Sequence, residues 1–308
     1  MRVLVFGGGG FIGSGIVERL LAESHQVTVF EKSGVPHLNG PLASARLTWI
    51  HGDILSMEQV GAAIRGVDAV VHLVSTTLPK SSNENPIYDV QSNVVGTLHI
   101  LNAMVQHEVP RILFISSGGT VYGNPVYLPI DEKHPTEPHV SYGVTKLAIE
   151  KYLGIYERLH GIVAMVLRVA NPYGERQRVE TAQGAVGVFL ERALRGLPIE
   201  IWGDGSVIRD FIYIRDVAEA FAKALVYEGE ERVFNVSSGL GTSLNELVKV
   251  IERALGRPVE LQHRPGRAFD IPVSVLSNAL ARREFGWEPR VGLAEGISRT
   301  IDWFRGAM

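Results

Sequence analysis

Two side chains that could transfer a proton stand four residues apart in the stretch Ser141-Tyr142-Gly143-Val144-Thr145-Lys146. If this stretch is helical, the two side chains share one face, and the Lys146 ammonium can stabilise the phenolate form of Tyr142. A free tyrosine has a pKa of about 10, and moving it about three units toward neutrality takes roughly 4 kcal/mol. A lysine in a desolvated cleft could supply much of that. The spacing also fits an ordinary helix start capped by Ser141, so the elements around it must decide.

A glycine-rich stretch follows the first apolar run of the chain. Residues 2–6 are mostly apolar, residues 7–13 read Gly-Gly-Gly-Gly-Phe-Ile-Gly, and residues 14–21 have helical periodicity. The glycines fit Gly-x-Gly-x-x-Gly at 8, 10 and 13, and equally Gly-x-x-Gly-x-x-Gly at 7, 10 and 13. In either register, glycines let backbone N–H groups approach a pyrophosphate at the positive end of a helix. The pattern predicts a dinucleotide site.

An acidic residue follows the next apolar run. Glu31 comes directly after the strand pattern at 27–30 and eighteen residues after Gly13. An acid at this point would bind the adenosine ribose hydroxyls and repel a 2′-phosphate, which favours NAD over NADP. Glu31 could instead be a solvated residue at a strand end, and the positive charge of the neighbouring Lys32 weakens the preference for NAD. NADP therefore stays open.

Strand and helix patterns alternate through the first half of the chain. Further strands are predicted at 47–50, 69–73, 111–115 and 163–168, with helices at 56–65 and 87–107 between them. This alternation predicts an α/β fold with a doubly wound parallel sheet, whose ligand crevice lies outside the carboxyl ends of the strands. The glycine stretch, Glu31, His72 and residues 116–120 all fall at those ends.

The alternation stops near residue 172. We expect a NAD-binding domain over residues 1–171, and a substrate-binding lobe made mainly of residues 172–308, with some segments returning to the first domain. Helices are expected at about 184–195 and 243–255, and a strand at 233–236.

Composition excludes several classes of partner. The 308 residues carry a formal net charge of -3, so electrostatics gives no reason to expect nucleic acid or an anionic membrane as a partner. There is no cysteine, which excludes disulfides, thiolate metal sites and a cysteine nucleophile. Apolar runs are too short to span a bilayer, and Met1 leads straight into the first strand pattern. We expect a soluble cytoplasmic protein without a metal.

Together these motifs resemble the extended short-chain dehydrogenase/reductase family, and most closely its nucleotide-sugar 4-epimerase branch. The resemblance covers nearly the whole chain and rests on several motifs in order: Gly7-x-x-Gly10-x-x-Gly13, Asp53-Ile54, Asn93 in Asn-Val-Val-Gly-Thr, Ser116 to Gly123, Tyr142-x-x-x-Lys146, Arg168-Val-Ala-Asn171-Pro172, Arg209-Asp210-Phe211 and Arg267-x-x-Asp270.

The resemblance implies a Rossmann domain and an NAD-dependent inversion at C4 of a UDP-hexose, either UDP-glucose/UDP-galactose or the N-acetylated pair. Tyr142 would take the proton of the sugar 4-hydroxyl while C4 gives hydride to NAD, and hydride returns to the opposite face of the 4-keto sugar. Lys146 would also touch the nicotinamide ribose, and the nicotinamide cation would help to lower the pKa of Tyr142. The family also implies a homodimer through the helices that hold Asn93 and Tyr142.

The resemblance assigns further residues to the cofactor and to the substrate. Cofactor contacts would come from Gly7, Gly10, Phe11, Ile12, Gly13, Glu31, Asp53, Ile54, Asn93, Tyr142 and Lys146. The nucleotide diphosphate would be held by Asn171, Arg209 and Arg267, because a diphosphate suits guanidinium groups, and the nucleoside ribose by Asp270.

The chain departs from the family at Gly118, where a serine or threonine usually bonds the reacting hydroxyl. Ser117, Thr120 or a water would take over this contact, and we prefer Thr120 or Ser117. The same stretch lacks the Asp-Glu pair of the 4,6-dehydratases, which disfavours dehydration. The small Ser274 hints that N-acetylhexosamines fit, although an indifferent strand serine is the alternative.

Two other functions stay open. One is a nucleotide-sugar 4-keto reductase or decarboxylase that uses NAD(P). The other is a non-catalytic nucleotide-sensing relative, suggested by Gly118 alone.

Overall fold

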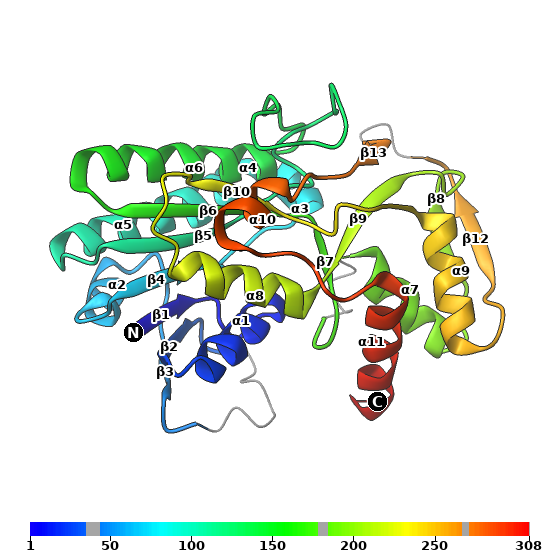
Figure 1. Cartoon of the computed structure of the whole chain (residues 1–308), viewed down its shortest axis with the longest axis horizontal. Helices are drawn as coiled ribbons and strands as arrows, with labels where there is room; N and C mark the ends of the chain where they lie inside the picture. The colour runs from blue at the N-terminus through cyan, green and yellow to red at the C-terminus, as the bar shows by residue number, and fades with distance from the viewer. Residues whose placement is uncertain (35–43, 178–183, 267–270, 308) are drawn as a thin grey trace.

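A seven-stranded parallel sheet forms the centre of the protein, for which a computed structural model describes residues 1–34, 44–177, 184–266 and 271–307. The strand order is β10-β6-β5-β4-β1-β2-β3 (Figure 1). The strands are β1 (Arg2–Phe6), β2 (Gln26–Glu31), β3 (Leu47–His51), β4 (Ala69–His72), β5 (Arg111–Ser117), β6 (Val163–Val169) and β10 (Val233–Val236). The predicted α/β fold with a parallel sheet is confirmed, as are the predicted strands.

Helices cover both faces of this sheet. Successive side chains of β1 point to opposite faces, so Val3 and Val5 join one buried cluster while Leu4 and Phe6 join another. Because both faces of the sheet are buried, side chains on both sides of the strands are mostly apolar, which explains the continuous apolar runs in the sequence. The first cluster packs against α1 (Phe11–Ala22) and α8 (Ile214–Leu225), and the second against α2 (Met57–Ile64), α5 (Gly96–Gln106) and α6 (Ser141–His160).

Most of the remaining chain builds smaller sheets beside the large one (Figure 1). One contains β7 (Asn171–Tyr173), β9 (Ile208–Tyr213), β11 (Gly241–Ser243) and β13 (Val273–Ser274), and another pairs β8 (Ile199–Trp202) with β12 (Leu261–Arg264). The helices of this part are α7 (Ala185–Leu194), α9 (Leu244–Leu255), α10 (Ala279–Phe285) and α11 (Leu293–Ala307). The predicted helices at 184–195 and 243–255 are confirmed.

The helical stretch after β4 is more broken than predicted. The expected single helix at 87–107 is α4 (Pro86–Asp89), a π-helical segment η1 (Val90–Val95) and α5 in succession. A short helix α3 (Pro79–Glu84) precedes them. The sequence did not predict α3, because its serines and asparagine favour turns in isolation. Helical π segments are rare and often occur near functional sites.

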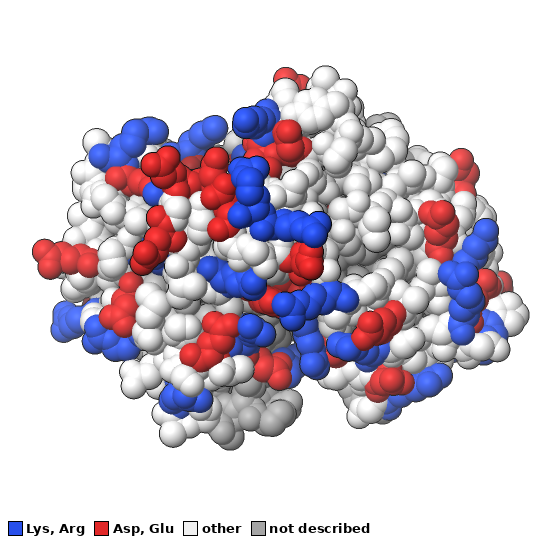
Figure 2. Space-filling view, viewed as in Figure 1, with Lys and Arg blue, Asp and Glu red and all other residues white. Residues whose placement is uncertain are grey.

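Charges of both signs are interspersed on the face shown in Figure 2, over the part of the chain that is described. Within the described ranges, no helix is both long and apolar enough to cross a membrane. Within the same ranges, no group of three or more His, Asp or Glu side chains is placed to hold a metal ion.

Candidate active site

Tyr142 and Lys146 lie on one face of α6, as their spacing predicts. The Lys146 ammonium nitrogen is 5.6 Å from the centroid of the Tyr142 ring and 4.7 Å from that of Phe114. It donates a hydrogen bond to the Ile115 carbonyl, 3.0 Å away. Phe114 and Ile115 belong to β5, so the pair lies close to the carboxyl end of a central strand.

Burial sets the charge states of this pair. It raises the pKa of Tyr142 to about 12, helped by the negative charge of Asp89 and opposed by a hydrogen bond with Ser75. It lowers the pKa of Lys146 to about 8, against the attraction of Asp89 and Glu150. The prediction that Lys146 draws the pKa of Tyr142 toward neutrality is therefore wrong for this structure. The removal of water from each group is the largest cause of both shifts.

The loop after β5 packs on the first turn of α6 and carries a buried hydroxyl group. The Thr120 side-chain oxygen is buried and has no hydrogen-bond partner among the described residues. A Cβ built on Gly143 would lie 2.7 Å from the Thr120 carbonyl oxygen, so the first turn of α6 packs directly on Thr120. A buried hydroxyl without a partner is costly, which makes Thr120 the side chain here that is best prepared for a polar ligand.

Packing explains the glycine at position 118. A Cβ built on Gly118 would lie 2.3 Å from Cδ1 of Leu276, a fully buried side chain on the segment after β13. Leu276 therefore fills the space that a serine would need. Ser117 ends β5 and is partly exposed, and Gly119 lies near Asn171.

A buried charged network lies behind the loop. Glu150, one helical turn after Lys146, pairs with Arg168 at 2.6 Å and accepts a hydrogen bond from Ser116. Arg168 also donates to the Tyr122 hydroxyl, which in turn donates to Asn235. This network ties both ends of the stretch 116–122 to α6, β6 and β10. Sequence reasoning missed it, and the only local signal was an acid four residues after Lys146.

The glycine loop is shaped to admit a pyrophosphate. Gly7 has a φ of 84°, which favours glycine, and a Cβ on Gly13 would lie 2.2 Å from the Gly7 carbonyl oxygen. Gly10 is the N-cap of α1, and Phe11 and Ile12 begin that helix with no acidic residue in its first turn. The backbone N–H groups at this helix end can therefore meet an anion. The positive φ at Gly7 favours the register 7, 10 and 13.

Glu31 lies next to the glycine loop. The Gly9 N–H donates to a Glu31 carboxylate oxygen at 2.9 Å, which holds the acid at the carboxyl end of β2. Lys32 instead points its ammonium toward Asp53, 3.6 Å away. Ile54 is buried and packs on Gly96, whose Cβ would lie 2.6 Å from Cδ1 of Ile54.

Asn93 is buried in η1, and its amide is occupied by protein groups. It donates to Thr77 and Asp89 and accepts the N–H of Thr76. The structure thus gives Asn93 a supporting role for the loop after β4.

The predicted substrate residues meet around β9. Asn171 donates to the Asp210 carbonyl at 2.9 Å, and Arg209 donates to the Ile271 carbonyl at 2.6 Å. Ser274 is buried and pairs in register with Arg209. The Asp210 carboxylate accepts hydrogen bonds from the turn at residues 238–239. Arg267 and Asp270 lie outside the described residues.

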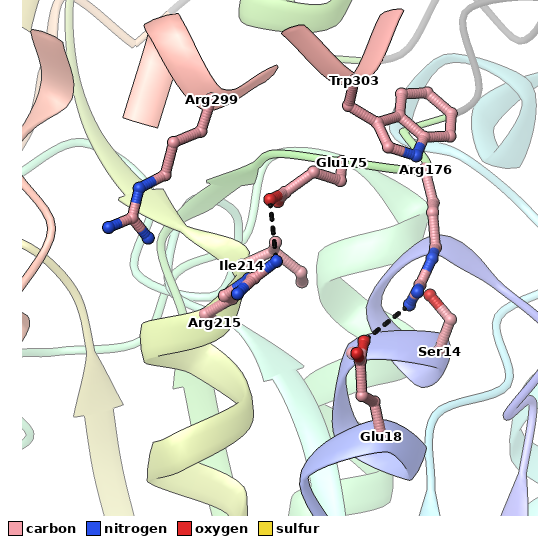
Figure 3. Close-up of a pocket in the computed structure, with 9 residues that line it drawn as sticks. Ser14, Glu18, Glu175, Arg176, Ile214, Arg215, Arg299 and Trp303 are labelled. Atoms are coloured by element: carbon pink, nitrogen blue, oxygen red, sulfur yellow. Dashed lines mark hydrogen bonds and ion pairs between the residues drawn. The ribbon is translucent and has the colours of Figure 1, made fainter. Parts of the chain in front are cut away.

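A separate cavity of about 170 Å³ opens between α1, the start of α8 and α11 (Figure 3). Four of its charged groups form two pairs: Arg176 with Glu18 at 3.0 Å, and Arg215 with Glu175 at 3.3 Å. The Arg176–Glu18 pair joins the helix after the glycine loop to the segment that follows β7, so the cavity connects parts of the chain that are distant in sequence.

The fold and the site define a dinucleotide-binding α/β protein with a tyrosine–lysine pair at the carboxyl edge of its sheet. Residues 3–237 match the model of the NAD dependent epimerase/dehydratase family, and the chain belongs to that family. The family's dependence on NAD confirms the predicted cofactor at that level, and its identity confirms the predicted resemblance.

Relatives agree over the full length of the chain. A UDP-glucose 4-epimerase of Mycolicibacterium smegmatis is 38% identical over 309 residues, covering 99% of each chain. The crystal structure of a Thermus thermophilus UDP-glucose 4-epimerase in complex with NAD has a TM-score of 0.91 at 37% identity and covers 100% of both chains. A Thermotoga maritima UDP-glucose 4-epimerase with UDP-glucose has a TM-score of 0.94 at 33% identity, covering 100% of this chain and 99% of its own.

Proposed function

We propose that this protein is an NAD-dependent epimerase that inverts C4 of a UDP-hexose, either UDP-glucose/UDP-galactose or the N-acetylated pair. The observation that carries the proposal is that Tyr142 and Lys146 lie together on α6 at the carboxyl edge of the sheet. The first turn of this helix packs on Thr120, whose buried hydroxyl has no partner among the described residues. Full-length similarity to UDP-glucose 4-epimerases supports the choice of substrate.

The cofactor site would be formed by the glycine loop and the acids beside it. Gly7, Gly10 and Gly13 would leave room for the pyrophosphate, the N–H groups of Phe11 and Ile12 would bind it, and Glu31 would suit a ribose diol. Asp53 and Ile54 would lie at the adenine, and Asn93 would act through the loop after β4. NAD, when bound, accepts and returns a hydride.

Tyr142 would hold and move the proton of the sugar 4-hydroxyl. Thr120 would hydrogen-bond the sugar hydroxyl, because the Thr120 hydroxyl is buried without a partner among the described residues. Position 118 cannot supply this contact, because Leu276 occupies the space that a serine side chain would need there. Ser117 is the second candidate for this contact. Lys146 would keep a positive charge near the phenol, a role that its pKa of about 8 allows near neutral pH.

The substrate would lie toward β9. Asn171 and Arg209 would hold the diphosphate together with Arg267, and Asp270 would bind the nucleoside ribose. We also propose that residues 1–171 bind the cofactor and that residues 172–308 form most of the substrate-binding lobe.

Proton NMR in deuterated water tests this function. The purified protein, without added cofactor, is given UDP-glucose and UDP-N-acetylglucosamine in separate tubes. The galacto product with hydrogen, not deuterium, at C4 is expected in at least one tube. Deuterium at C4 would contradict an internal return of hydride.

Tyr142→Phe is expected to fold, to retain NAD and to lose at least about 100-fold in turnover, the range typical of removing a general acid–base group. Tyr156→Phe, further along α6, is the matched control and should keep full turnover. Full turnover by Tyr142→Phe would rule out this residue as the base.

We also propose that the protein is a homodimer. Val144, Tyr152, Ile155 and Leu159 recur at helical spacing on α6 and are exposed, as is Ile87 on the neighbouring α4. A second copy that presents the same strip would bury these side chains, as the family resemblance leads us to expect.

A further inference from the structure

The helix that carries Tyr142 is capped by another part of the chain. The residue before α6 is Val140, whose aliphatic side chain cannot accept a hydrogen bond. The first backbone N–H groups of a helix need partners outside it. Ser141 N–H donates to Asn83 at 2.9 Å, and Tyr142 N–H donates to Ser82 at 3.0 Å. Both acceptors belong to α3, so α3 fixes the backbone of Tyr142 itself.

Asp89 joins this helix end to the loop after β4. Its side chain is fully buried (0% exposed) and lies at the end of α4. One carboxylate oxygen accepts hydrogen bonds from Ser141 at 2.7 Å and Thr145 at 3.3 Å, both in the first turns of α6. The other accepts hydrogen bonds from Thr77 and Asn93. These four donors are neutral, and they come from both sides of the carboxylate.

The same loop reaches the side chain of Tyr142. Ser75 hydrogen-bonds the phenol, and Thr76 is held by Asn93, which also contacts Asp89. The backbone of Tyr142 is therefore fixed through α3, and its phenol through the loop at 75–77. Asp89 contacts both the loop, at Thr77, and α6, at Ser141 and Thr145. A buried carboxylate is costly to place unless hydrogen bonds satisfy it, and these four donors do so.

We propose that Asp89 is a positioning residue for the Tyr142–Lys146 pair, which clamps the first turn of α6 to the loop at 75–77 and keeps the phenol at the carboxyl edge of the sheet. This inference rests on the proposed role of Tyr142 as the proton-transferring group. It does not place Asp89 in contact with substrate or cofactor.

Asp89→Asn tests the proposal because it keeps the size of the side chain. The new amide keeps one acceptor oxygen instead of two. If its N–H bonds face Asn93, two donors oppose each other; if they face Ser141 and Thr145, both hydroxyls must turn to accept, so one side of the clamp is weakened. We expect kcat to fall about 10- to 100-fold, as small misplacements of reacting groups do, with KM for the UDP-sugar within about two-fold and bound NAD unchanged. Asp216→Asn, another buried aspartate, on α8, is the control and should keep kcat.

Hydrogen exchange provides a second measurement that does not depend on the sugar. The N–H groups of Ser141 and Tyr142 should exchange faster in Asp89→Asn than in the wild type and the Asp216 control. If the wild type turns over neither UDP-sugar, the proposed function fails, and the exchange rates alone still decide whether Asp89 fixes this turn. Unchanged exchange, or equal losses of kcat in the two variants, would overturn the proposal.

Exposed Asn83 offers a variant that should fold even if Asp89→Asn does not. Asn83→Ala removes one acceptor from the N-terminus of α6 and should lower kcat about three-fold or more. Asn83→Asp keeps the acceptor and adds a negative charge at the N-terminus of α6, so it should restore kcat. Full turnover by Asp89→Asn, or by Asn83→Ala where the former does not fold, would overturn the proposal.

Discussion

Gly118→Ser tests whether packing, rather than catalysis, requires the glycine. The added Cβ would lie 2.3 Å from Cδ1 of Leu276 and 3.2 Å from the Arg168 carbonyl oxygen. Carbon atoms in contact are separated by about 3.5–4.0 Å, so Leu276 must move by about 1 Å or more. Its backbone cannot follow easily, because its N–H donates to Asp210 and its carbonyl accepts from Ser237.

Overpacking of this kind costs about 1–3 kcal/mol. The unfolding entropy of a chain of 308 residues is roughly 0.65 kcal/mol per degree, so Tm should fall by about 2–5 °C. Turnover should fall as well, because the strained loop carries Thr120. Thermal unfolding and the C4 epimerisation rate measure both effects.

Gly119→Ser is the matched control for stability, since its Cβ would meet only the Asn171 side chain, at 3.9 Å, among the described residues. Leu276→Val should relieve the clash, so that the double variant with Gly118→Ser is about 1–2 kcal/mol more stable than the sum of the single effects. If Gly118→Ser has the same Tm as the wild type, packing against Leu276 is not the reason for the glycine at position 118.

Two further changes test charge and assembly. Burial lowers the pKa of Lys146 from 10.5 to about 8. Below pH 8 the buried ammonium therefore reduces the free energy of unfolding by about 3 kcal/mol, and this destabilisation fades as the pH rises to 10.5. Lys146→Met should therefore be inactive yet more stable than the wild type at pH 7, with a smaller gain at pH 10 in denaturant unfolding; an equal gain at both would contradict this reasoning. The double variant Ile155→Glu, Leu159→Glu should sediment as a monomer, while the wild type should sediment as a dimer. Leu197→Glu, at another exposed site, is the control and should also sediment as a dimer. A wild type with the mass of one chain would refute the dimer.

Local patterns were sufficient to predict the sheet and the glycine loop. Continuous apolar runs mark strands buried on both faces, and Gly7 and Gly13 are required by backbone geometry within the loop itself. Glu31 was found because its position depends on a fixed distance from that loop. The spacing of Tyr142 and Lys146 placed them on one face, since a helix repeats locally.

Contacts between distant segments could not be predicted in the same way. Nothing around Val140 indicates that α6 is capped from α3, and Asp89 reads as an ordinary acid until Ser141 and Thr145 are brought to it. Similarly, Gly118 reads as a missing hydroxyl, and its reason lies in Leu276, which arrives from the far end of the chain. Both cases concern residues whose role is set by a neighbour in space.

The largest error concerns the electrostatics of the proton-transferring pair, and it has a physical cause. The sequence places a cation near a phenol, but the fold also removes water from both, which raises the pKa of Tyr142 to about 12 and lowers that of Lys146 to about 8. Each shift favours the neutral form. In the chain alone, burial thus favours Tyr142 as a phenol, and a further positive charge beside it would favour the phenolate. NAD, bound at the carboxyl edge of the sheet, would supply that charge in its oxidised form only, so we expect the pKa of Tyr142 to be lower with NAD bound than with NADH bound.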